Sequence, residues 1–400
     1  ETAVAQRALT NAAGAVTNYT AINGEGSHGG LRITAGNVWL DAMAFTNCTS
    51  GDQATYSGLA YSGAGTLVAN NCRFEKNKSP SSYNYHGLGA YFSAGAVLLT
   101  NCVVADNIEY GYGANGYGIC SVGANLQLID CVVSNNSGEA FASRQSYGCG
   151  LYFDNGTLSV LRTDFLVNTG GVNNGTGGGG AVYLGSSANM AASFSNCVFR
   201  GNRALPTGPG GKGGAIWVNL NSLSKTVLVA NCTFADNRNE TTGAFACGGG
   251  IAVSKGTVVI KNSIFWTNTI QDGVSGREIH ADSVNSKVTG SYVCIGSTNA
   301  PDVVAANSAV VQWGAGIMSQ NPLYASATDA HLKSKGGRWN PGTGLWANDL
   351  VSSPCIDAGD PADPVGLEPR ANGNRINLGA YGGTTQASKT YVTGTLFMVH

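Results

Sequence analysis

Charged residues are scarce in this 400-residue sequence. Asp, Glu, Lys and Arg make up 11% of it, against roughly a quarter in an ordinary globular protein, and 22 basic residues nearly balance 23 acidic ones. Lys and Arg do not cluster, which excludes the basic surface of a nucleic-acid-binding protein. No stretch approaches the roughly 18 continuous apolar residues of a membrane-spanning helix. Long runs of helix-forming Glu, Lys, Leu and Ala are also missing.

The chain is instead rich in turn-forming residues, and it carries a long repeat. Its 58 glycines show no period of three, which excludes collagen, and Asn, Ser and Thr are frequent. Seven times an apolar residue is followed three positions later by Asn, at intervals of 29 to 35 residues. A fixed period of this length indicates stacked supersecondary units. The pairs are Phe74/Asn77, Val104/Asn107, Val133/Asn136, Phe165/Asn168, Phe199/Asn202, Phe234/Asn237 and Phe265/Asn268.

Each repeat divides into three short strands. In one unit an apolar strand follows the glycine pair 213–214, a second alternates at 227–229, and Cys232-Thr233-Phe234 forms a third. Alternation with period two turns the small residue and the apolar anchor inward and the residue between them outward. Three strands in about 30 residues fit one coil of a parallel β-helix, with the recurrent Asn forming a corner ladder. With one further coil at each end, the sequence predicts about nine or more three-strand coils.

Five of the eleven cysteines recur two positions before the apolar anchor. An odd number of cysteines is compatible with a secreted disulfide framework. Their repeated position, which Thr163 and Ser263 also occupy, favours a buried column of free thiols. No CxxC pair with a second Cys or His pair is present, which argues against zinc. The column residues are Cys72, Cys102, Cys131, Cys197 and Cys232.

The repeat also predicts the domain boundaries. We expect an N-terminal cap or lead-in over residues 1–29, the parallel β-helix over 30–300, and a less regular C-terminal capping region over 301–389. Residues 390–400 form a strand-like tail that is compatible with continuation into a further domain. The chain starts at Glu1 without a cationic and apolar leader, so we interpret it as a processed mature chain or an excised piece.

Two sets of segments resemble known families. The first set alternates with the Phe-x-x-Asn pairs and comprises Gly-Gly-Ala-Val (179–182), Gly-Gly-Ala-Ile (213–216) and Gly-Gly-Gly-Ile (248–251). This pattern resembles the repeats of chlamydial polymorphic outer-membrane proteins, which are right-handed β-helical adhesins. The C-terminal segments 321–324, 353–359 and 377–383 are similar to the closing region of choice-of-anchor secreted β-helix proteins, in the pectate-lyase-like superfamily. The resemblance implies an all-β, right-handed, single-stranded parallel β-helix and export, and it leaves the activity open.

The outward positions show no familiar catalytic pattern. None of the four polygalacturonase-like motifs occurs, and the nearest relative is Arg162-Thr163-Asp164, in which Asp164 is expected to point outward alone. Outward residues before the anchors form no acidic ladder, so paired-carboxylate glycoside chemistry and calcium-assisted lysis lack their side chains there. His86 and His280 fall three coils or more apart and are interpreted as solvated loop residues. No catalytic residue is therefore predicted, and a protein without enzymatic activity is favoured.

Candidate binding residues come from the variable loops and from outward tyrosines beside those loops. The variable loops leave one corner of the rod and are rich in Tyr, Gly, Asn and Ser, a composition suited to adaptable contacts. The alternative is that the loops are tolerated decoration and that Tyr91 and Tyr152 pack beneath them. No cofactor is predicted, although Asp357, Asp360 and Asp363 are candidate calcium ligands; the missing EF-hand arrangement favours a simple turn. The candidate ligand-binding residues are Tyr83, Tyr85, Tyr91, Tyr110, Tyr112 and Tyr152.

Two classes of function follow. The first is a secreted or cell-surface structural or adhesive protein, such as an adhesin, stalk or fibre subunit, that presents a loop-rich face to glycans, cells or copies of itself. The alternative is a polysaccharide lyase or glycoside hydrolase of the pectate-lyase-like superfamily, with an atypical site. The expected location is extracellular or on the bacterial cell surface. The expected partners are a polysaccharide or cell-surface ligand or further copies in a fibre, with no nucleic acid and no transmembrane segment.

Overall fold

The computed structural model describes most of the chain. Most of the predicted lead-in and of the strand-like tail falls outside the described residues. The described residues are 20–22, 25–26, 30–50, 56–79, 86–110, 115–138, 146–173, 176–185, 187, 190–207, 210–241, 247–271, 273 and 276–392.

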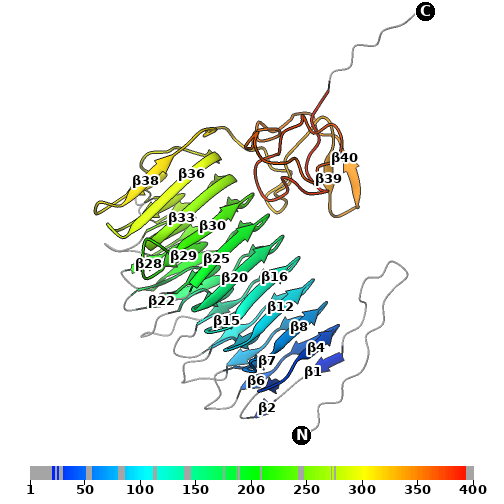
Figure 1. The fold of residues 1–400 in the computed structure, drawn as a ribbon, viewed down its shortest axis with the longest axis vertical. Coiled ribbons are helices and arrows are strands. Elements are labelled where there is room, and N and C mark those ends of the chain that lie inside the picture. The colour runs from blue at the N-terminus through cyan, green and yellow to red at the C-terminus, as the bar shows by residue number, and fades with distance from the viewer. Residues whose placement is uncertain are drawn as a thin grey trace, which may run out of the picture.

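The chain folds into an all-β, right-handed parallel β-helix, which confirms the predicted fold class (Figure 1). Three strands of each coil form three faces, and most of them belong to one 27-stranded sheet. The regular part makes about seven turns rather than nine or more. Coils around Phe45 and Val293 continue the stack but lack the repeated Asn. Among the described residues there is no helix that is long and apolar enough to cross a membrane.

The first face follows the glycine-rich turn of each coil. Its strands are β3 (Leu31–Ile33), β7 (Leu59–Tyr61), β11 (Ala90–Phe92), β15 (Ile119–Ser121), β19 (Leu151–Phe153), β24 (Val182–Leu184), β29 (Ile216–Asn219), the start of β33 (Ile251–Trp266), β35 (Ile279–Ala281) and β37 (Val303–Ala305). The second face consists of β4 (Val38–Asp41), β8 (Thr66–Asn70), β12 (Ala96–Thr100), β16 (Asn125–Ile129), β20 (Gly156–Leu161), β25 (Met190–Ser195), β30 (Thr226–Ala230), the middle of β33, β36 (Ser286–Ile295) and β38 (Val310–Trp313).

The third face carries the apolar anchors. Its strands are β1 (Thr20–Ile22), β5 (Met43–Thr46), β9 (Arg73–Glu75), β13 (Val103–Ala105), β17 (Val132–Ser134), β21 (Asp164–Leu166), β26 (Val198–Arg200), β31 (Thr233–Ala235) and the ends of β33 and β36. A nine-stranded sheet follows it, with β2 (Glu25–Gly26), β6 (Thr49–Ser50), β10 (Lys78–Ser79), β14 (Ile108–Glu109), β18 (Ser137–Gly138), β22 (Thr169–Asn173), β27 (Arg203–Thr207), β32 (Arg238–Asn239) and β34 (Thr269–Ile270). Two small sheets pair β23 (Thr176–Gly178) with β28 (Gly210–Lys212) and, antiparallel, β39 (Arg338–Asn340) with β40 (Leu345–Ala347).

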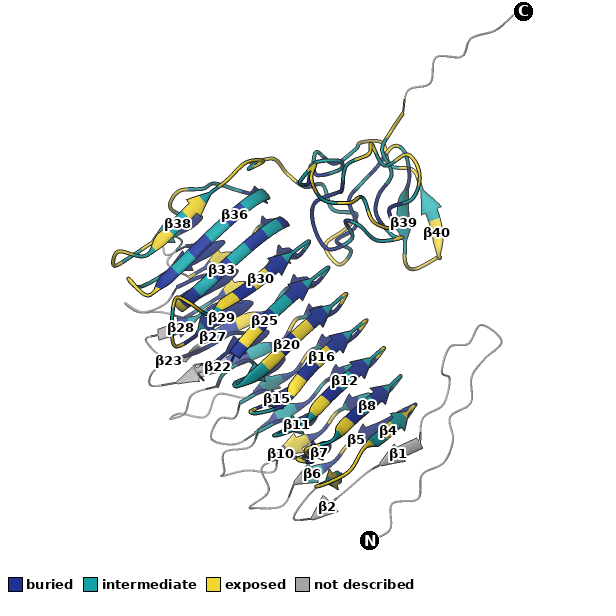
Figure 2. Ribbon diagram, in the orientation of Figure 1, coloured by how far each residue is buried: buried dark blue, intermediate teal, exposed yellow. Residues whose placement is uncertain are grey.

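Side chains at equivalent positions stack along the interior of the rod. Buried residues recur along the strands of successive coils (Figure 2). The rings of Phe165, Phe199, Phe234 and Phe265 lie nearly parallel, with successive centroids 4.9, 4.6 and 4.5 Å apart. Each such ring is fully buried, which stabilises the fold by about 1.5–3 kcal/mol. The predicted column of cysteines is buried as thiols. The Cys102 thiol, for example, donates to the Thr100 carbonyl at 3.3 Å.

The repeated Asn residues form a buried ladder, as predicted. Each amide donates to the side-chain oxygen of the Asn in the next coil, at 2.7–3.0 Å from Asn77 to Asn268. Its second proton goes to a backbone carbonyl of the preceding coil, as from Asn168 to Val133 at 2.8 Å. The ladder ends where the Asn268 amide donates to Glu278. Burial raises the pKa of that carboxyl group to about 8, so Glu278 is largely neutral at pH 7.

The turns of each coil use residues with positive φ. This conformation belongs to the residue before each ladder Asn, such as Asp106 (56°) and Val167 (49°), and not to the ladder Asn itself. The residue before each column cysteine also has positive φ, as Asn101 (52°) and Asn196 (55°) show. Asn tolerates this left-handed conformation better than most residues do. Both edges of the third face are thus formed by single left-handed residues.

Residues 321–392, the C-terminal region, pack along the third face (Figure 1). Ala330 and Ala380 contact Val198, and Leu332 and Leu378 join a buried cluster with Ile264 of β33. The predicted capping region therefore covers outward side chains of the late coils. That burial agrees with the apolar or small outward residues Val198, Thr233 and Ile264, whereas Arg200 is a buried cation that packs on the Tyr324 ring.

Removing one rung of the ladder should destabilise the rod. In Asn168→Ala, the Asn136 amide and backbone N–H and the Val133 carbonyl lose buried partners. We expect the free energy of unfolding to fall by about 2–5 kcal/mol, measured by chemical denaturation. Asn285→Ala, in an exposed turn, is the control and should change it by less than about 0.5 kcal/mol. Equal effects of the two changes would contradict a structural role for the ladder.

Candidate functional site

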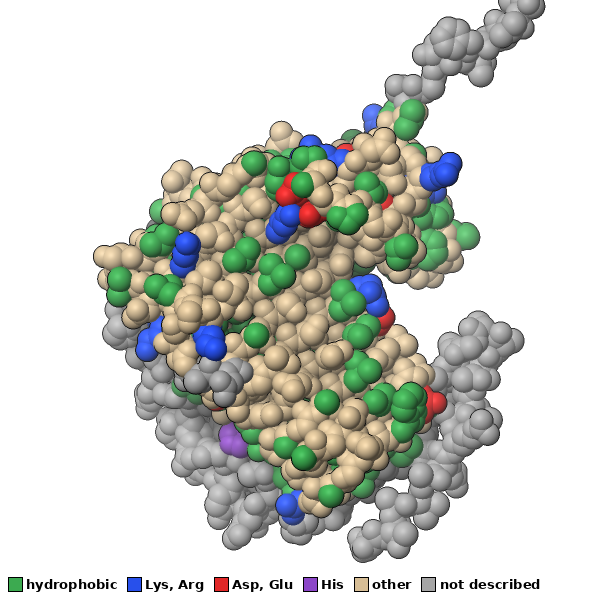
Figure 3. All heavy atoms as spheres, viewed as in Figure 1, with side chains coloured by type: hydrophobic (Ala, Val, Ile, Leu, Met, Phe, Trp, Pro, Cys, Tyr) green, Lys and Arg blue, Asp and Glu red, His purple; other side chains and the backbone are tan. Residues whose placement is uncertain are grey.

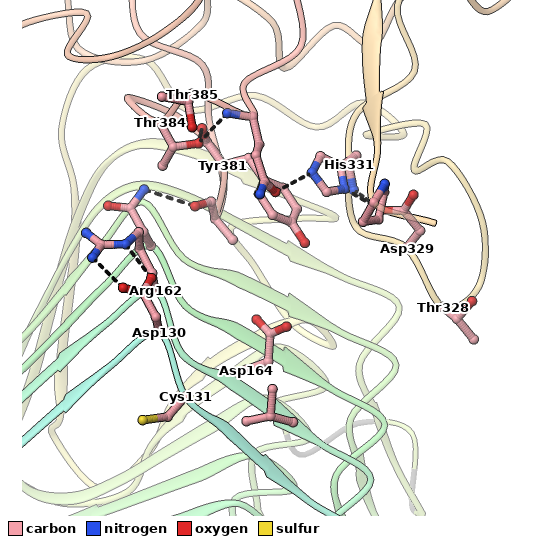
Figure 4. Close-up of a pocket in the computed structure, with 15 residues that line it drawn as sticks. Asp130, Cys131, Arg162, Asp164, Thr328, Asp329, His331, Tyr381, Thr384 and Thr385 are labelled. Atoms are coloured by element: carbon pink, nitrogen blue, oxygen red, sulfur yellow. Dashed lines mark hydrogen bonds and ion pairs between the residues drawn. The ribbon is translucent and has the colours of Figure 1, made fainter. Parts of the chain in front are cut away.

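A cleft lies where the C-terminal region meets the third face (Figure 3). It has a volume of about 520 Å³ and is lined by residues of both parts. In Figure 4, Asp130, Arg162 and Asp164 extend from the coils, while His331 and Tyr381 face them from the C-terminal region. This cleft, in which charged side chains from distant segments meet, is the candidate functional site.

The left-handed corner before the cysteine column builds one side of the cleft. On the late coils this corner holds the C-terminal region: Asn196 donates to the Ala380 and Gly382 carbonyls at 2.9 and 2.7 Å. At the same corner, Arg162 lies one coil earlier and Asp130 two coils earlier, and these two side chains form a bidentate ion pair at 2.6 and 2.8 Å. The cleft therefore begins at the coil where the C-terminal region no longer covers this corner.

Asp164 forms the floor of the cleft. It lies outward on β21, in register with Val132 and Val198 of the neighbouring coils. Val198 is covered by the C-terminal region, whereas Asp164 lies at the edge of that cover and points into the cleft (Figure 4). Burial raises the pKa of this carboxyl group to about 6, although the charges of His331 and Arg200 oppose the rise. Asp164 thus carries a proton for part of the time near neutral pH.

A network around His331 forms the opposite wall. Its Nδ1 lies 2.6 Å from Asp329 Oδ1, its Nε2 lies 3.2 Å from Gln386 Oε1, and its ring stacks on Tyr381 at 3.5 Å. Burial opposes ionisation of Asp329, but hydrogen bonds from His331 and the charge of Arg338 outweigh it and lower the pKa of Asp329. His331 is thereby fixed by partners on both ring nitrogens, and Asp329 stays ionised.

The cleft combines hydrogen-bonding groups of several kinds. It offers one carboxyl group that is protonated more readily than usual, ionised carboxylates, a guanidinium group, and the hydroxyl groups of Thr384 and Thr385. Such a set suits a ligand with many hydroxyl groups, and the protonated carboxyl group can donate a proton. Within the described part of the chain, no three His, Cys, Asp or Glu side chains are grouped to hold a metal.

The predicted tyrosines that the structure describes lie outside the cleft. Tyr91 is on β11 and stacks on Tyr56 at 5.7 Å, and Tyr152 is on β19 and stacks on Tyr183 at 5.2 Å. Tyr110 is half-buried, and its backbone N–H donates to the Ser79 hydroxyl at 3.2 Å. Of the six tyrosines, three fall outside the described residues: Tyr83, Tyr85 and Tyr112.

The candidate calcium ligands point in different directions. Asp360 and Asp363 both form ion pairs with Lys261 of β33, at 2.9 and 2.7 Å. Asp357 instead accepts a hydrogen bond from the Thr390 hydroxyl at 2.7 Å. Two of the three carboxylates thus fasten the C-terminal region to the rod. Calcium binding itself stays a prediction.

Some predictions about the polar residues need correction. Asp164 was expected to stand alone, but it shares the cleft with charged side chains of the C-terminal region, including Asp329. His280 is buried on β35 rather than solvated, and half-buried His86 accepts a hydrogen bond from the Asn115 N–H at 3.3 Å. Strand alternation could place Asp164 outward. No feature of the local sequence could show that residues more than 160 positions later form the opposite wall of the cleft.

Two family models match parts of the chain. Residues 8–165 match a model described as a right-handed β-helix region, and residues 231–359 match a model described as disaggregatase related. The first agrees with the observed fold, and the second spans the last coils and part of the C-terminal region. No curated protein and no solved structure matches the chain significantly.

The raised pKa of Asp164 should make stability depend on pH. Folding favours the protonated form, so the wild type loses stability as pH rises from about 4 to above 6. Asp164→Asn keeps the shape without the charge. The stability of the variant relative to wild type should therefore rise by about 1–3 kcal/mol between pH 4 and pH 8, measured by denaturation.

Asp41→Asn provides the control for this titration. Asp41 is exposed on the second face, away from the cleft, so the pH dependence that we assign to Asp164 should not appear in this variant. If Asp164→Asn also gave a constant difference, Asp164 would titrate as an ordinary solvated carboxylate.

Proposed function

We propose that this protein is a secreted or cell-surface β-helical protein that binds a segment of polysaccharide in the cleft. The observation that carries this proposal is the set of fixed charged and hydroxyl side chains that converge there from the coils and the C-terminal region. Sugars present many hydroxyl groups, which carboxylates, amides and guanidinium groups bind through directed hydrogen bonds. The hollow opens to the side in Figure 3, so a long chain can bind with only part of its length inside.

The rod supports an adhesive role. A solenoid is stiff along its stack because each coil bonds to the coils before and after it, so it can display a site away from a surface. An extracellular or cell-surface location belongs to the same proposal, and the resemblance to exported β-helix proteins supports it. The partner we propose is a glycan on a cell or in its surroundings, rather than further copies of the chain in a fibre.

A second candidate function is cleavage of the bound glycan. Glycoside hydrolysis needs a carboxylic acid with a raised pKa and an ionised carboxylate beside it. Asp164, with a pKa of about 6, suits the first role, and Asp130 and Asp329 are carboxylates of the same cleft.

Binding can be tested with immobilised neutral, acidic and amino polysaccharides and by calorimetry with their oligosaccharides. Arg162→Gln removes a charged donor from the cleft and should weaken binding roughly tenfold to a hundredfold. Arg203→Gln is a matched control, because Arg203 also forms an ion pair, with Glu240, and is equally exposed at 44% against 43%. Equal affinities of the two variants, or no binding across the panel, would count against the proposal.

Cleavage is measured separately, as release of reducing ends or unsaturated products from any polysaccharide that binds. The second candidate predicts product release by the wild type and its loss in Asp164→Asn, while affinity is retained. Binding without product release by the wild type would leave the protein as an adhesin.

A further inference from the structure

Six of the eleven cysteines lie outside the interior column, and two of these six, Cys294 and Cys355, share one buried cluster. Cys294 is on β36, one residue after the inward Val293, and pairs in register with Ile264. Cys355 belongs to the C-terminal region. Both side chains are completely buried and join one apolar cluster with Leu332 and Leu378. These two thiols therefore meet at the interface between the rod and the C-terminal region.

Within this cluster each thiol is the leading side-chain influence on the pKa of the other, and the Cys294 thiol donates to the Gln320 carbonyl at 3.1 Å. The hydrogen bond from Cys355 lowers the pKa of Cys294, whereas the same bond and burial raise that of Cys355. Cys294 is thus the better nucleophile of the pair, because the thiolate is the reactive form.

We propose that Cys294 and Cys355 form a disulfide bond when the protein folds in an oxidising compartment, and that this bond fastens the C-terminal region to the rod. The Cys294 thiolate attacks a disulfide of a small molecule or an oxidoreductase, and one thiolate of that disulfide leaves. Cys355, after losing its proton, then attacks the mixed disulfide and releases the second thiolate. The two cysteines lose two electrons and two protons, and the acceptor disulfide is reduced to two thiols.

The column cysteines are not suited to the same reaction. Cys102 lies between Cys72 and Cys131, so neither pairing is preferred. Cys197 and Cys232 have only each other, but both thiols donate to the carbonyl two residues earlier and both lie within the rod itself. Thr163 and Ser263 take equivalent places and donate to carbonyls two residues earlier, as the cysteines do. A hydroxyl group therefore fills the structural role of the thiol in this column. Cys294 and Cys355 instead have one cysteine partner each, across two parts of the chain.

The bond would close a loop that carries the wall of the cleft. Roughly 60 residues separate the two cysteines, and Asp329 and His331 lie between them. A cross-link of this span restricts the unfolded chain and stabilises the docked state. Because both sulfurs are buried once the C-terminal region has docked, the bond should form during folding and resist reductants afterwards.

The test uses the full chain, produced once in an oxidising and once in a reducing compartment. Free thiols are alkylated in denaturant without reduction, and the digests are analysed by mass spectrometry. From the oxidising compartment we expect a linked peptide pair containing Cys294 and Cys355, with the other nine cysteines alkylated. Recovery of both cysteines as alkylated thiols from correctly folded, oxidised protein would overturn the proposal.

Single cysteine replacements provide a second test of the proposed disulfide bond. Cys294→Ala and Cys355→Ala should each abolish the linked pair and lower the melting temperature of oxidised protein by several degrees, with little further change on adding reductant. Cys120→Ala, at a buried cysteine of the first face, should leave the linked pair intact. A linked pair between column cysteines instead would contradict the assignment. None of these outcomes depends on whether the cleft binds a glycan.

Discussion

The structure depends on the parallel pairing of each coil with the next. This pairing holds neighbouring strands about 4.8 Å apart and places strand side chains on their equivalents in the coils before and after, apart from a register shift after Val218. A residue type is then favoured if it packs well against its equivalent in the next coil. Phenylalanine rings do so face to face, and Asn does so because one amide both donates and accepts.

The corner side chains do not have to pack against their equivalents in the neighbouring coils. A left-handed residue at each turn points its side chain away from the stack, so its chemistry can change from coil to coil. Along one corner, Asn196 binds the C-terminal region, whereas Arg162 and Asp130 form a pair inside the cleft. The site thus arises from ordinary positions of the repeat, which become distinctive only because the C-terminal region covers part of the face beside them.

The parts of the fold that the sequence predicted are those that the stack dictates. Phe234 and Asn237 could be assigned from period and alternation, because their partners are copies of themselves one coil away. The cleft could not be predicted in this way. Asn196 bonds to Ala380, 184 residues later, and neither residue carries a local sign of the other. Aromatic content was misleading for a related reason, since Tyr152 stacks on Tyr183 of the next coil rather than lining the cleft.

The scarcity of charge also follows from the stack. A charged residue repeated in every coil would face its like at about 4.8 Å, where like charges destabilise neighbouring strands. Charges are better accommodated where the repeat is interrupted by the C-terminal region. Lys261 pairs with Asp360 and Asp363 there, and buried Arg200 lies under the Tyr324 ring at 4.9 Å. The few charges of this chain are therefore informative. Among the described residues, Asp164 lies at that boundary without an ion-pair partner, and the ligand that we propose would bind beside it.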